Sequence, residues 1–140
     1  MPARARVLVL EDDAGYRRLV ASVLRSAGHE VLEAEHGTVA HLLCAAEYVD
    51  LVVAQATLAG LEVLGRVDEA RRPPLILMSP ALSGEMRDRM RALGAVCSVH
   101  RPVFVDELRA AVTRALADGP RRRPREPIAW PAARNAQPEA

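Results

Sequence analysis

Short runs of aliphatic residues that stop at polar side chains are the strongest constraint on how this chain folds. The first run is Val7-Leu8-Val9-Leu10, and it stops at Glu11-Asp12-Asp13. An uninterrupted apolar run of this length is typical of a parallel strand that is buried on both faces. Four more strands are predicted over residues 30–34, 50–54, 75–78 and 95–100, the first of these being more exposed and the last weaker.

Segments with helical periodicity separate the predicted strands. They cover residues 14–27, 39–46, 61–70, 83–93 and 105–117. Gly28 and Gly94 are placed to end the first and fourth helices, His36-Gly37 is predicted as a turn, and Arg72-Pro73-Pro74 breaks the third helix. Five strands that alternate with five helices predict an α/β domain whose parallel sheet is covered on both faces.

Composition bounds the remaining possibilities. A chain of 140 residues with 50% hydrophobic residues suits one domain with one core. The formal net charge of +1 gives no overall attraction to nucleic acid or to an anionic membrane. The two cysteines, Cys44 and Cys97, are too few for a disulfide framework and are expected to be buried and reduced. The apolar run near the N-terminus is too short for a signal peptide or a membrane span, so we expect a cytoplasmic protein.

The last segment, residues 118–140, differs from the rest of the chain. It is rich in proline and arginine and has no apolar periodicity, so we expect a domain over residues 5–117 and a disordered tail. The Arg121-Arg122-Arg123-Pro124-Arg125 cluster has no aromatic residue within it for stacking on bases, although Trp130 follows. A charged flexible tail is therefore the expected interpretation, and nucleic-acid binding is an alternative.

Polar residues follow the predicted strands at the points where those strands end. Ligands of open parallel sheets bind beside the carboxyl ends of the strands. Adjacent carboxylates at such an end can hold a hard cation such as Mg²⁺, and a hydroxyl with a guanidinium favours an anion. The residues concerned are Glu11, Asp12 and Asp13 after strand one, Gln55 after strand three, Ser79 after strand four and Arg101 after strand five.

Taken in this order, the sequence resembles the receiver domains of bacterial two-component response regulators. The matching segments are VLVLEDD, GHEVLEAEHG, VDLVVAQ, LILMSP and GAVCSVHRPVFVDEL. The resemblance covers about residues 5–117. It implies a doubly wound, flavodoxin-like (βα)5 fold with the strand order 2-1-3-4-5. It also implies that Glu11 and Asp12 form the acidic pair of the site, with Asp13 beside them.

The resemblance places Gln55 where the family has its phospho-accepting aspartate. An amide oxygen is a poor nucleophile, so we expect Gln55 not to accept a phosphoryl group. The amide also removes a negative charge, and we therefore expect at most weak Mg²⁺ binding at Glu11 and Asp12.

Two further positions depart from the family's pattern, and a third keeps one of its features. Arg101 stands at the family's lysine, and Ser98 stands at its aromatic switch residue. The resemblance also implies a cis peptide bond before Pro102, while a trans proline that begins a loop stays open.

These departures predict a degenerate, stand-alone receiver of two-component signalling that is not an enzyme and works by protein–protein contact. The expected partner is a histidine kinase, a phosphotransfer protein or an output protein, and homodimerisation stays open. Contact is expected through the fourth helix, fifth strand and fifth helix, or through the first helix. The alternatives are a conventional Mg²⁺-dependent receiver that uses another acid, and a ligand-binding or nucleic-acid-binding pseudo-receiver.

Overall fold

Five parallel strands form one sheet in the order β2-β1-β3-β4-β5. The computed structural model describes residues 4–55, 66, 73–78, 84–93, 95–99 and 105–118. In chain order its elements are β1 (Arg6–Leu10), α1 (Ala14–Ser26), β2 (Glu30–Ala34), α2 (Gly37–Ala46), β3 (Leu51–Gln55), β4 (Leu75–Met78), α4 (Gly84–Ala92), β5 (Ala95–Val99) and α5 (Val105–Asp118). The predicted strand order is confirmed, while the helix predicted over 61–70 and the tail after Asp118 lie outside the described residues.

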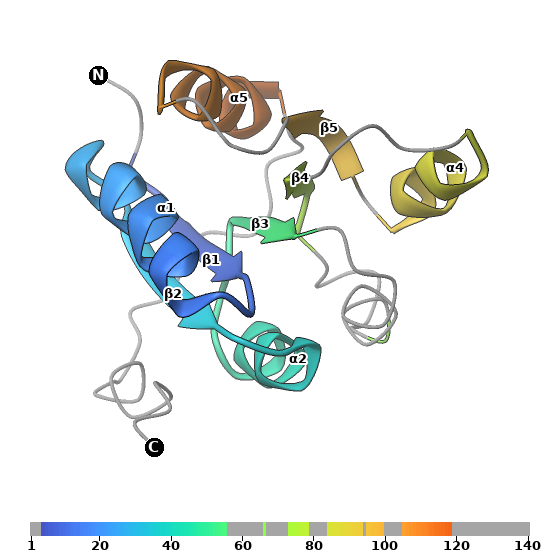
Figure 1. The fold of residues 1–140 in the computed structure, drawn as a ribbon, viewed down its shortest axis with the longest axis horizontal. Helices are drawn as coiled ribbons and strands as arrows, with labels where there is room; N and C mark the ends of the chain where they lie inside the picture. The colour runs from blue at the N-terminus through green and yellow to red at the C-terminus, as the bar shows by residue number, and fades with distance from the viewer. Residues whose placement is uncertain are drawn as a thin grey trace.

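Helices cover both faces of the sheet (Figure 1). On one face, Val7 and Val9 of β1 pack in a hydrophobic cluster with residues of α1 and α5. On the other face, Leu8 and Leu10 pack in a second cluster with residues of α2 and α4. All five residues of β1 are buried, as expected for a central strand with a helix layer on each side. Cys44 is buried in the second cluster, as predicted.

Several predicted boundaries differ from the structure by one or two residues, among them the start of the second helix and the end of the third strand. The second helix begins at Gly37 and not at Val39, because His36 has the extended backbone of an N-cap residue and Gly37 is buried as the first helical residue. The third strand includes Gln55, because Gln55 pairs with Met78 of β4.

The amino-terminal edge of the sheet carries a cluster of charged residues around Arg6. The side chain of Arg6 is 8% exposed, and its Nε donates to Glu30 Oε1 at 2.9 Å. Its Nη1 donates to the carbonyl oxygen of Tyr48 at 3.1 Å, and its backbone N–H donates to Asp50 Oδ2 at 2.8 Å. Arg6 therefore joins the first residue of β2 to the segment that leads into β3.

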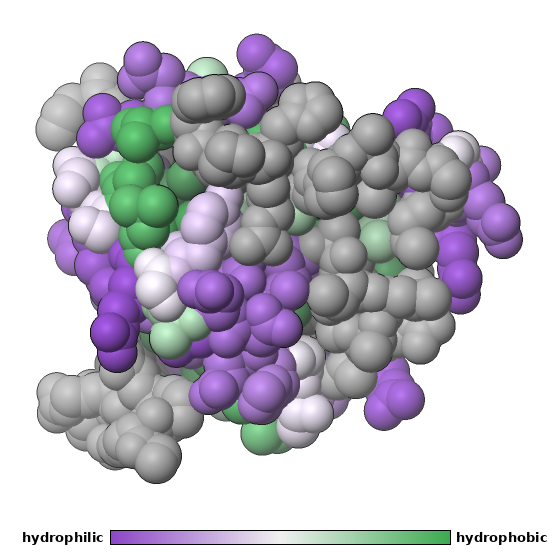
Figure 2. Space-filling model, viewed as in Figure 1, coloured by the Kyte–Doolittle hydropathy of each residue, from purple (hydrophilic) through white to green (hydrophobic). Residues whose placement is uncertain are grey.

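Figure 2 shows, in the view of Figure 1, hydrophobic residues gathered over α1 next to α5, with mostly hydrophilic residues around them. Four large hydrophobic side chains in the described part of the chain are exposed, namely Leu19, Leu42, Val96 and Val105. No helix in that part combines the length and the hydrophobicity that a transmembrane segment needs.

Candidate functional site

Glu11 and Gln55 lie at the carboxyl ends of two neighbouring strands. Leu10 of β1 pairs with Ala54 of β3, so Glu11 follows directly beside Gln55. Glu11 is fully buried and Gln55 is 8% exposed, whereas Asp12 and Asp13 are exposed. The structure thus brings the predicted acidic residues and the predicted acceptor position together at one edge of the sheet.

A hydrogen bond joins the two strand ends. The backbone N–H of Asp12 donates to Oε1 of Gln55 at 2.5 Å. The backbone N–H of Asp13 donates to Oε2 of Glu11 at 3.1 Å, so the turn after β1 folds around the Glu11 carboxylate. Two consecutive backbone donors are therefore satisfied by side chains of the site itself.

Asp13 has a second partner that the sequence did not reveal. Its Oδ1 accepts a hydrogen bond of 2.8 Å from the backbone N–H of Tyr16, and its backbone is extended, so it is the N-cap of α1. An aspartate at this position satisfies an otherwise unpaired N–H and interacts favourably with the positive end of the helix dipole. Asp13 therefore caps the start of α1 and follows the predicted acidic pair, Glu11 and Asp12, in the chain.

Arg17 is a residue of this site that the sequence analysis missed. Its Nη1 donates to the carbonyl oxygen of Glu11 at 2.9 Å, and its Nε lies 3.2 Å from Glu33 Oε1. Arg17 thus ties the first turns of α1 to the end of β1 and to β2. Its spacing of four residues from Asp13 places it one helical turn inside α1, which is the only signal in the sequence.

Gln55 offers a Mg²⁺ ion less charge than a third carboxylate beside Glu11 and Asp12 would. Mg²⁺ prefers charged oxygens in octahedral geometry. Gln55 contributes a neutral oxygen that already accepts the Asp12 N–H, and Oε2 of Glu11 accepts the Asp13 N–H. Within the residues that the structure describes, no group of three or more His, Cys, Asp or Glu side chains is arranged to hold a metal ion.

Ser98 lies on β5, where it pairs with Leu77 of β4. It is exposed and lines a hollow of about 130 Å³ between β5 and α4. Arg87 and Arg91 of α4 line the same hollow. The other predicted site residues, Ser79, Arg101 and Pro102, lie outside the described residues.

Comparison with known proteins assigns this arrangement to a family. The model of the response regulator receiver domain matches residues 7–113. The chain is 32% identical over 118 residues to the probable transcriptional regulator ycf27 of Pyropia yezoensis, with 81% of this chain and 48% of that protein covered. It is 29% identical over 117 residues to sporulation initiation phosphotransferase F of Bacillus subtilis, with 79% of this chain and 93% of that protein covered.

Solved structures agree on the fold. The chemotaxis response regulator CheY4 of Vibrio cholerae superposes with a TM-score of 0.72 at 23% identity, covering 81% of this chain and all of that one. A CheY-like receiver domain protein of Methanospirillum hungatei gives a TM-score of 0.74 at 20% identity, covering 83% and 96%. The chain spans about half the length of the ycf27 relatives. The family model and these matches show that the chain belongs to the response regulator receiver domain family of two-component signalling.

Proposed function

We propose that this receiver domain works without phosphorylation and acts by contact with another signalling protein. The observation that carries the proposal is the side chain of Gln55. It ends β3, where the family resemblance expects the acceptor aspartate, and its amide oxygen accepts the backbone N–H of Asp12. An amide oxygen cannot take the place of a carboxylate as the nucleophile in phosphoryl transfer.

The surroundings of Gln55 support the same proposal. The buried carboxylate of Glu11 lies beside it, and a neutral amide avoids the repulsion that a second buried carboxylate would add. The turn after β1 is held by two hydrogen bonds within the chain, from the backbone N–H groups of Asp12 and Asp13.

Treatment of the purified chain with acetyl phosphate and Mg²⁺ tests the first half of the proposal. Intact-mass spectrometry should show no mass increase of one phosphoryl group, while a phosphorylatable receiver treated in parallel should show it. Gln55→Asn is the matched neutral variant and should behave as the unaltered chain does. A phosphorylated wild-type chain would contradict the proposal and favour a conventional receiver that uses another acid.

The face formed by α4 and β5 supports the second half of the proposal. Val96 is 54% exposed in the hollow beside Ser98. Arg87 and Arg91 line the same hollow, and Arg91 lies 4.0 Å from the carboxylate of Asp88. Because the side chain of Ser98 is small, the hollow is open to a side chain of a partner protein. Exposed apolar residues with arginines around them are typical of contact sites between proteins.

Cross-linking in native cells followed by mass spectrometry tests this contact surface. Val96→Lys should abolish cross-links to the partner, while Leu42→Lys on α2 should leave them unchanged. The pair is matched, because Val96 and Leu42 are 54% and 59% exposed. Equal retention of the partner by both variants would exclude the α4–β5 face and leave α1 as the expected contact.

A further inference from the structure

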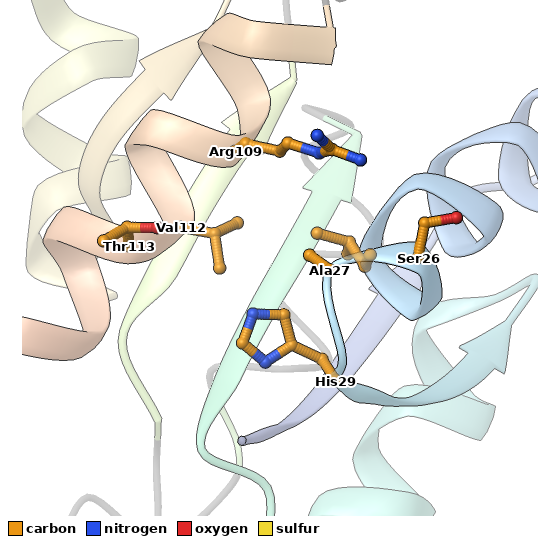
Figure 3. A pocket seen from close by; sticks show the side chains of 7 residues that line it. Ser26, Ala27, His29, Arg109, Val112 and Thr113 are labelled. Carbon is orange, nitrogen blue, oxygen red and sulfur yellow. The ribbon is translucent and has the colours of Figure 1, made fainter. Parts of the chain in front are cut away.

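A pocket between the end of α1 and the middle of α5 lies away from the carboxyl edge of the sheet (Figure 3). Its volume is about 240 Å³. This is less than the volume of sites for drug-sized ligands, which begin near roughly 300 Å³, and several times the roughly 30 Å³ of a water molecule. The lining residues are Leu24, Ser26, Ala27, His29, Arg109, Val112 and Thr113.

His29 is held rigidly at one side of this pocket. Gly28 has φ +96°, a left-handed conformation that glycine adopts readily, and it turns the chain so that the backbone N–H of His29 donates to the carbonyl oxygen of Leu24. The imidazole Nδ1 accepts the backbone N–H of Ala5 at 3.2 Å, and the residue is 6% exposed. Because Nδ1 is an acceptor, the proton of the neutral ring is on Nε2.

Hydrogen-bond donors line the pocket, and the one acid that acts on His29, Asp50, is not among the lining residues. The ring nitrogen of His29 that is not bonded to Ala5 faces α5, and the guanidinium of Arg109 reaches from α5 toward the end of α1 (Figure 3). Among the residues that the structure describes, none pairs with the Arg109 side chain or accepts a hydrogen bond from His29 Nε2. Thr113 adds a hydroxyl on α5, while Figure 3 shows the side chain of Ser26 turned away from His29 and Arg109. No lining residue is acidic.

We propose that this pocket binds a small organic carboxylate. The carboxylate oxygens would accept hydrogen bonds from Arg109 and from Nε2 of His29, two donors on opposite sides of the pocket. The apolar residues Leu24, Ala27 and Val112 would contact a short hydrocarbon part of the ligand. This apolar lining favours an organic acid over inorganic phosphate, which has no surface to bury there.

The inference does not depend on the proposed function. The pocket shares no residue with the site at Gln55 or with the hollow beside Ser98. A phosphorylatable receiver could carry it equally well, and failure of either proposal leaves the other intact.

Titration of the full ¹⁵N-labelled chain with sodium butyrate tests the proposal. Amide resonances of residues 24–29 and 109–113 should shift and saturate, and butyrate should bind more tightly than acetate. Inorganic phosphate and sodium chloride at the same ionic strength should give no saturating shift there. The same ligand should raise the melting temperature, by an amount that grows with the logarithm of its concentration above the Kd.

Variants of α5 and of His29 make the test specific. Arg109→Gln should weaken butyrate binding about tenfold or more through loss of a charge-assisted hydrogen bond. Arg114→Gln is the matched control, because Arg114 is an exposed residue of the same helix outside the pocket. His29→Asn keeps an oxygen acceptor for the Ala5 N–H and removes Nε2, so it should also weaken binding.

Three results would overturn the proposal. The first is the absence of saturating shifts at residues 24–29 and 109–113 in the wild-type chain. The second is phosphate binding that equals butyrate binding, which would rule out the role of the apolar lining. The third is an equal loss of binding in Arg109→Gln and Arg114→Gln, which would show that only the net charge of the helix matters.

Discussion

The side-chain oxygen of Gln55 accepts a hydrogen bond from the backbone N–H of Asp12, so the last residue of β3 is joined to the turn that follows β1. The two residues are 43 positions apart in the chain. The bond connects the strand ends of two central strands through a neutral group. Its consequences for stability and for metal binding can both be measured.

Gln55→Asp should destabilise the domain at neutral pH by about 1–3 kcal/mol, because it replaces a satisfied amide with a carboxylate beside the buried Glu11. Mg²⁺ should recover part of this loss, since a third carboxylate improves the cation site. Urea unfolding with and without Mg²⁺ measures both effects. Gln55→Asn lacks the added charge, and a Mg²⁺ effect of equal size in that variant would contradict the prediction.

Asp13→Ala should lower the free energy of unfolding by about 0.5–2 kcal/mol, because the Tyr16 N–H at the start of α1 loses its acceptor. Asp13→Asn keeps an oxygen that can cap the helix and should remain close to the wild type. Urea unfolding followed by circular dichroism compares the three proteins. Equal stability of the alanine and asparagine variants would show that capping by this side chain contributes nothing.

His29 should make the stability of the domain depend on pH. Burial lowers the pKa of His29 below 6.5 in the folded chain, and the nearby carboxylate of Asp50 opposes this shift only in part. The unfolded chain therefore binds more protons just below pH 6.5, so the free energy of unfolding rises with pH in that window and levels off above it. Protonation of Nδ1 would also break the bond from Ala5.

The comparison of wild type with His29→Asn isolates this contribution. Urea midpoints are measured at several pH values on both sides of 6.5. The wild type should gain stability relative to the variant as the pH rises to 6.5, and the difference should then stay constant. A difference that is flat throughout this range would contradict the assigned direction of the shift.

Glu47→Gln should stabilise the domain at neutral pH by up to about 1 kcal/mol. Glu47 is 6% exposed and burial raises its pKa above 4.5, with Arg6 opposing the shift and Glu30 adding to it. The folded chain therefore holds this proton more tightly than the unfolded chain, and stability falls as the pH rises from 4.5 through the folded pKa.

Thermal unfolding of the wild type and Glu47→Gln at neutral pH and below pH 4.5 checks the prediction. The advantage of the glutamine variant should shrink in acid, where the glutamate is protonated. A variant that is less stable than the wild type at neutral pH would show that the attraction to Arg6 outweighs the cost of burial.

The repeating pattern of the sequence predicts most of the fold, and pairwise contacts across the sheet account for what it misses. The apolar run Val7–Leu10 predicts a buried strand because burial on both faces leaves no polar position in it. The predicted start of α2 is two residues late, because a buried glycine that starts a helix looks in sequence like a turn residue. The partnership of Gln55 with Asp12 needs the strand order, which a local pattern does not contain.

The contacts of His29 are also absent from the local sequence pattern. Its sequence position after Gly28 predicts only the end of a helix. Its role in the pocket depends on Ala5 from the start of β1 and on Arg109 from α5, residues that come together only in the folded chain. Periodicity identifies which side chains are buried, and it does not identify which distant atoms they meet.

The contacts of Arg6 lie at the amino-terminal edge of the sheet. They affect which residues at the carboxyl edge can change without loss of the fold. Because its guanidinium meets Glu30 and its backbone N–H meets Asp50, a slip of either neighbouring strand by one residue would leave a buried charge without its partner. Correct alignment of the three strands is thus enforced at their beginnings. The alignment of the three strands therefore does not depend on which side chain stands at the carboxyl end of β3.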